Sequence, residues 1–172
     1  MRELWWFIHI FGISLWFGVT TAVLLMWPSK QSLRNASTQS EVFVRIQTLV
    51  SMLTKSSHMG AGLTALGGVV LSFMVHPKSD LASLWLTSMQ GLGVAAFIIS
   101  TLVMTRKGKR LVKQIGPQRI EDRELQVQTA NTNSLAIDEQ FLGAASGYRG
   151  WLWSVFILLL VCLFMAAFKL TF

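Results

Sequence analysis

Four long apolar runs divide the chain, and each has the length needed to cross a lipid bilayer. A helix rises about 1.5 Å per residue, so a hydrocarbon core of about 30 Å takes about 20 apolar residues. Each run must be helical, because lipid offers no hydrogen-bond partner to exposed backbone amides. The sequence therefore predicts an all-α membrane protein, an antiparallel bundle of four transmembrane helices at residues 4–26, 59–75, 81–104 and 151–170.

Basic residues are concentrated in the two long connections, residues 28–57 and 105–149. The opposite side of the predicted bundle holds only Arg2, Lys78 and Lys169. Since connections rich in Lys and Arg stay in the cytoplasm, both connections are predicted to be cytoplasmic and both termini to be outside. The connections hold twelve such residues: Lys30, Arg34, Arg45, Lys55, Arg106, Lys107, Lys109, Arg110, Lys113, Arg119, Arg123 and Arg149.

Parts of these connections carry helical patterns of their own. Apolar residues of segment 41–57 fall on one stripe of a helix, with polar residues largely opposite. Segment 107–115 is expected to prolong the third span until a Gly-Pro pair stops it. Gly143 and Gly147, just before the fourth run, are interpreted as a hinge or cap. We therefore expect cytoplasmic helical extensions on a single membrane domain, residues 1–172.

Composition supports the membrane assignment and narrows the function. Hydrophobic residues make up 52% of the chain and charged residues only 13%, against about a quarter in soluble domains. The net charge of +7 would suit nucleic acid, but topology already explains where the charges lie, so the predicted partner is the lipid bilayer and no nucleic acid. The four runs contain no Asp or Glu, which argues against a proton-relay transporter. The single cysteine, Cys162, excludes a disulfide framework.

Small residues recur every four positions along the second run and so share one helix face. They are Gly60, Thr64, Gly68 and Ser72. Small residues let lipid-embedded helices approach closely. A compact four-helix bundle explains this face, and a dedicated dimer interface is the alternative.

The first run carries an imidazole that is costly to place in lipid. His9 shares a helix face with Gly12, Trp16 and Thr20, and it lies about 7.5 Å below the predicted outer boundary. A polar ring at that depth is a functional-site hypothesis. The alternative is an interfacial histidine that bonds a helix-end carbonyl.

The predicted topology places other candidate ligands in the same outer layer as His9. They are Met74, His76, Met89, Cys162 and Met165. Thioether ligands suit Cu(I), and imidazole suits copper or haem iron. Methionine also fills apolar cores, which is the alternative reading. His58 opens the inner end of the second run, about 25 Å from this layer, and is expected to be an interfacial histidine.

The segment from Ile8 to Gly18, IHIFGISLWFG, resembles the first helix of the copper-resistance protein D superfamily. In that superfamily a His is followed by a small residue and then by Trp-x-Gly, which here is Trp16 to Gly18. The four-helix protoporphyrinogen oxidases are similar in outline, and their first-helix His is associated with haem b. The Lys that those oxidases carry after a Trp-Leu pair has no counterpart after Trp85-Leu86.

The resemblance implies a bacterial inner-membrane protein that binds copper or haem b near its outer face. His9 is then the primary ligand, with His76 or Met89 as its partner. Two other functions stay open: a haem-dependent membrane oxidoreductase, and a non-catalytic accessory or scaffold subunit. The last would recruit a cytoplasmic protein through residues 106–139.

Overall fold

The computed structural model describes residues 2–34, 39–75, 84–115 and 139–168. Within these ranges the chain is helical except for residues 27–29, and it contains no strand. The helices in chain order are α1 (Arg2–Met26), α2 (Lys30–Arg34), α3 (Gln39–Met52), α4 (His58–Val75), α5 (Leu84–Ile98), α6 (Thr105–Ile115) and α8 (Glu139–Phe168). Two π-helical turns, η1 (Leu53–Ser57) and η3 (Ile99–Met104), join α3 to α4 and α5 to α6.

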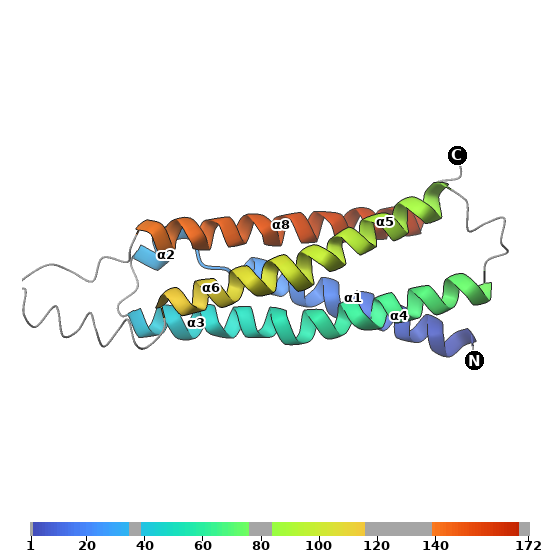
Figure 1. Ribbon diagram of the computed structural model, residues 1–172, viewed down its shortest axis with the longest axis horizontal. Helices are drawn as coiled ribbons and strands as arrows, with labels where there is room; N and C mark the ends of the chain where they lie inside the picture. The colour runs from blue at the N-terminus through green and yellow to red at the C-terminus, as the bar shows by residue number, and fades with distance from the viewer. Residues whose placement is uncertain (1, 35–38, 76–83, 116–138, 169–172) are drawn as a thin grey trace, which may run out of the picture.

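These elements form four long rods that lie side by side (Figure 1). The rods are α1, α3–η1–α4, α5–η3–α6 and α8, and each contains a helix long and apolar enough to span a membrane. The predicted all-α fold with four such helices is confirmed. We call the end where α1 begins and α8 ends the terminal end, and the opposite end, which carries α3 and α6, the basic end.

The helices extend further than the apolar runs alone. Continuous helix covers residues 39–75, about 55 Å, which exceeds a hydrocarbon core of about 30 Å. The helical extensions expected from segments 41–57 and 107–115 are present in α3–η1 and α6. The hinge or cap expected at Gly143 and Gly147 is wrong, because α8 runs through both without a break. Both glycines point into open space, so no neighbour forces a bend there.

The two ends differ in what they expose. Towards the terminal end, large apolar side chains face outward: Phe7, Ile10, Phe11, Leu66, Val69, Phe73, Val94, Ile98, Leu102, Ile157, Leu160 and Phe164. At the basic end, most apolar side chains are buried and the charged ones lie outside; the buried set includes Leu33, Val42, Ile46, Leu49, Val50, Leu111, Phe141, Leu142 and Ala145. An apolar exterior suits lipid and a charged exterior around an apolar core suits water. The change occurs close to η1 and η3.

One packed layer closes the core of the basic end. The rings of Trp27 and Tyr148 stack with their centroids 4.8 Å apart, and Trp27 Nε1 donates to the Ala145 carbonyl at 3.2 Å. A Cβ added at Gly108 would lie 2.7 Å from a Val50 methyl and 3.2 Å from the Tyr148 hydroxyl. Because residue 108 is a glycine, α6 can pass this close to Val50 of α3 and Tyr148 of α8. We call Trp27, Val50, Gly108 and Tyr148 the Tyr148 layer.

The Tyr148 hydroxyl is buried and has no hydrogen-bond partner among the described residues. Tyr148→Phe is therefore expected to raise the free energy of unfolding by about 1 kcal/mol, since an unsatisfied buried polar group is removed and the ring is kept. Tyr148→Ala should lower it by about 3–5 kcal/mol through loss of the ring. Thermal unfolding of both variants in one detergent checks this. A destabilised Tyr148→Phe protein would show that the hydroxyl is hydrogen-bonded.

Candidate ligand site around His9

The closest helix pair in the bundle is α1 with α4, and glycine makes it possible. A Cβ at Gly60 would lie 2.6 Å from the Trp16 backbone nitrogen, and a Cβ at Gly12 would lie 2.6 Å from the Thr64 backbone nitrogen. Real Cβ atoms do not approach backbone this closely, so the two backbones touch only because both positions lack a side chain. The structure thus places the small-residue face of the second run against α1.

The other predicted packing residues of α1 divide between two faces. Trp16 is 3% exposed and lies in the contact with α4, whereas Gly18 is exposed. A Cβ at Gly18 would meet nothing within 4 Å, so this glycine takes no part in the α1–α4 contact. Thr20 is buried, and its hydroxyl donates to the Trp16 carbonyl at 2.8 Å.

His9 sits against the middle of α4. A Cβ at Gly67 would lie 2.9 Å from His9 Cβ, and one at Gly68 would lie 3.1 Å from His9 Cε1. His9 Nδ1 lies 2.8 Å from the carbonyl oxygen of Thr64. Two consecutive glycines therefore open the space for the imidazole, and the preceding turn of α4 accepts its hydrogen bond. The alternative of an interfacial histidine required a carbonyl at a helix end, whereas the Thr64 carbonyl lies in the middle of α4.

This hydrogen bond fixes which nitrogen of His9 is available to a ligand. A carbonyl oxygen can only accept, so Nδ1 carries the hydrogen and donates it to Thr64. In the neutral ring with this tautomer, Nε2 presents a lone pair. No second hydrogen bond of His9 links it to another described residue. Histidines that ligate metals commonly have this arrangement, with the second nitrogen donating to a carbonyl or carboxylate.

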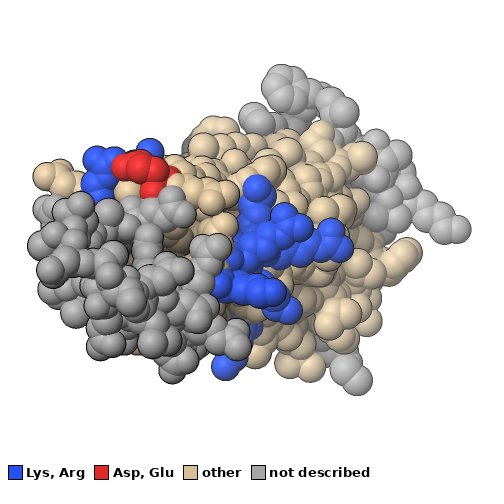
Figure 2. All heavy atoms as spheres, turned by 60° about the vertical axis from the view of Figure 1, so that its left-hand side comes forward, with Lys and Arg blue, Asp and Glu red and all other residues tan. Residues whose placement is uncertain are grey.

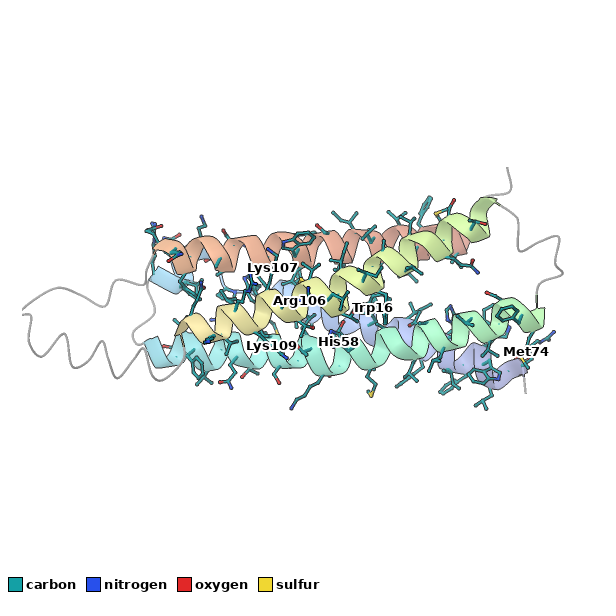
Figure 3. The ribbon with its side chains drawn as sticks, in the orientation of Figure 1. Trp16, His58, Met74, Arg106, Lys107 and Lys109 are labelled. Atoms are coloured by element: carbon teal, nitrogen blue, oxygen red, sulfur yellow. The ribbon has the colours of Figure 1, made fainter. Side chains whose placement is uncertain are left out.

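The predicted co-ligands lie at different distances from His9. Met74 is seven residues after Gly67, which is about 10 Å along α4, and its side chain lies at the terminal end of that helix (Figure 3). His76 lies outside the described residues. Met89 is on α5, where its carbonyl oxygen is 3.9 Å from the Cys162 sulfur of α8. The structure brings Met89 to Cys162, and it does not bring Met74 to His9.

A polar link that sequence reasoning missed ties α5 to α4 near this site. Gln90 Nε2 donates to the Ser72 hydroxyl at 3.1 Å, and that hydroxyl donates to the Gly68 carbonyl at 2.8 Å. Gly68 contacts the His9 ring, so α5 reaches the α1–α4 pair one helical turn from the imidazole. Ser72 continues the four-residue spacing of the second run, and that spacing was the available signal.

A second polar cluster surrounds His58 where the two π-helical turns face each other. His58 Nε2 lies 3.2 Å from the Ser100 carbonyl and 3.1 Å from the Thr105 hydroxyl (Figure 3 labels His58). The hydroxyls of Ser57 and Ser100 lie 3.4 Å apart and are buried. His58 is nine residues from Gly67, so the two histidines are about 14 Å apart along α4. The separation is shorter than expected because His9 packs against the middle of α4.

No protein-family model, curated protein or solved structure matches this chain. Its fold has the four long apolar helices of a multi-pass membrane protein. Within the described ranges, no group of three or more His, Cys, Asp and Glu side chains could hold a metal ion. A metal at His9 would therefore need methionine, a cofactor's own atoms or His76 to complete its coordination.

Proposed function

We propose that this chain is a multi-pass protein of the bacterial inner membrane that binds copper or haem b through Nε2 of His9. The observation that carries the proposal is the 2.8 Å hydrogen bond from His9 Nδ1 to the Thr64 carbonyl. It orients the ring and leaves one nitrogen lone pair for a ligand. The resemblance of the Ile8–Gly18 segment to the copper-resistance D superfamily supports the same residue.

The proposed orientation puts the basic end in the cytoplasm and both termini outside. The exposed Lys and Arg side chains of α6 and α3 support it, because positively charged segments stay on the cytoplasmic side. In this orientation His9, in the second turn of α1, lies in the outer part of the bilayer.

The donor set fits haem with fewer assumptions than copper. Haem iron is commonly held by a protein imidazole, and His9 would supply it. Copper needs further soft ligands, for which Met89 and His76 are the candidates. Bound haem would supply one-electron chemistry, so a haem-dependent membrane oxidoreductase is the alternative function.

The test is the absorption spectrum and metal content of protein purified without added ligand. The wild type should carry haem or copper, and His9→Ala should bind it more than about 100-fold more weakly, since even outer-shell changes cost 10–100-fold. His58→Ala is the matched control, because it removes an imidazole that lies about 14 Å away along α4. It should keep full occupancy.

Two results would contradict the proposal. One is a wild type with neither haem nor copper, which would favour the non-catalytic scaffold that recruits a partner through residues 106–139. Of that range, the structure describes 106–115 and residue 139. The other is unchanged occupancy in His9→Ala, which would place the ligand elsewhere.

A further inference from the structure

Exposed cations from several helices lie at one depth of the bundle, level with the Tyr148 layer. No Asp or Glu occurs in the sequence within five residues of any member of this layer, which is made of Trp27, Val50, Gly108 and Tyr148. Five residues correspond to about 7.5 Å of helix, so these positions form one narrow zone. We call its nine Lys and Arg side chains the cationic belt, and all are exposed: Lys30, Arg45, Lys55, Arg106, Lys107, Lys109, Arg110, Lys113 and Arg149.

The belt draws on α2 and on three of the four rods, and α6 contributes most. Arg106, Lys107 and Lys109 project from α6 (Figure 3), and the basic side chains gather on the surface of this end (Figure 2). Lys30 follows α1, while Arg45 and Lys55 come from α3 and η1. The zone therefore spans α2, α3–η1, α6 and α8 and is not confined to one helix.

The belt begins where the apolar exterior ends. Leu102 is 52% exposed and Arg106 follows one turn later; Met59 is 56% exposed and Lys55 precedes it by one turn. On α8, exposed Arg149 lies one turn before Trp153. A bilayer that covers the apolar exterior would place its phosphates at this depth.

Lys107 also shows the pattern of a membrane interface. Its Nζ lies 5.4 Å from the centre of the Trp151 ring, which is cation–π range. Tryptophan is enriched at the boundary between hydrocarbon and water. A cation held over such a ring stays at the level of the headgroups.

Four cations on α6 have no counter-charge in the described chain. Arg106, Lys109, Arg110 and Lys113 are three or four residues apart, so they share one helix face. None of them forms an ion pair or hydrogen bond with another described residue, whereas Arg34 of α2 pairs with Glu139. Like charges at this spacing destabilise a helix by a few tenths of a kcal/mol per pair, and a bound anion would relieve that repulsion.

We propose that the cationic belt binds the headgroups of anionic phospholipids in the leaflet at the basic end. A planar layer of phosphates matches charges that come from several helices and lie at one depth. A protein or nucleic-acid partner would instead be met by a patch on one side. Arginine and lysine near an anionic leaflet are attracted to it, and arginine can hold phosphate with two hydrogen bonds.

The test uses the wild-type protein in phosphatidylcholine vesicles that contain spin-labelled phosphatidylglycerol or spin-labelled phosphatidylcholine. The fraction of label slowed by the protein gives the relative association of the two lipids. We expect phosphatidylglycerol to be preferred about threefold or more. In R106Q/K109Q/R110Q the preference should be clearly reduced, because exposed Gln keeps the helix and three of the nine belt charges are removed.

The matched control is Arg34→Gln, since Glu139 already pairs that charge. It should leave the preference unchanged, and circular dichroism of both variants reports that they are folded. Equal association of both lipids with the wild type would overturn the proposal, as would an undiminished preference in the triple variant. If the preference appeared only after E121Q/D122N/E124Q, the anions that meet α6 would be the chain's own, and the proposal would be wrong.

Discussion

Gly60→Leu is expected to abolish stable packing of α1 against α4, and Gly60→Ala to lower the free energy of unfolding by about 1–3 kcal/mol. The reason is the 2.6 Å separation between a Cβ at Gly60 and the Trp16 backbone nitrogen. Backbone cannot move aside as a flexible side chain can, so the whole helix would have to shift. Because α1 and α4 form the most extensive helix contact, this loss affects the entire bundle.

Gly62→Ala is the matched control for this prediction. Gly62 lies on the same helix, half a turn away, and a Cβ there meets nothing within 4 Å. The change should leave stability unchanged or raise it by up to about 1 kcal/mol, because alanine favours helix over glycine. Unfolding by sodium dodecyl sulfate, followed by circular dichroism, measures both. Equal losses at the two positions would contradict close packing at Gly60.

The existence of the four long helices could be predicted because lipid leaves the chain few choices. An apolar run of about 20 residues in a bilayer must be a helix, and the runs at 4–26 and 59–75 agree with α1 and α4 within two residues at each end. The fourth apolar run, 151–170, marks only the later part of α8, which begins twelve residues earlier at Glu139. Its first turns lie in the core of the basic end, where Phe141 and Leu142 are buried, and such a short apolar set carries no membrane signal.

The surroundings of His9 were only partly predictable. The face it shares with Gly12 and Trp16 follows from helix periodicity, and both of those residues do contact α4. The position of α1 along α4 does not follow from periodicity. It is set by the close contacts of Gly12 and Gly60 with the backbone of the opposite helix. Depth counted from the end of each run put His9 level with Met74, whereas packing sets it against Gly67. The Thr64 carbonyl as its partner could not be foreseen for the same reason.

If the part with the apolar exterior lies in lipid and the basic end lies in water, a change from valine to aspartate should have different effects in the two parts. Val69 of α4 is 58% exposed and Val44 of α3 is 59% exposed, and both belong to one continuous rod. By exposure alone, Val69→Asp and Val44→Asp should be equivalent. We expect their effects to differ, because Val69 lies in the part with an apolar exterior and Val44 lies beyond the cationic belt.

Val69→Asp is expected to cost about 3 kcal/mol of membrane insertion, since a carboxylate would face hydrocarbon in mid-span. Val44→Asp should change stability by no more than about 0.5 kcal/mol, as surface substitutions in water usually do. The measurements are the amount of each variant in the membrane fraction and its thermal unfolding in detergent. Equal damage from both would put α3 inside the bilayer. The depths inferred for the cationic belt and for His9 would then be wrong together, because both are counted from the same boundary.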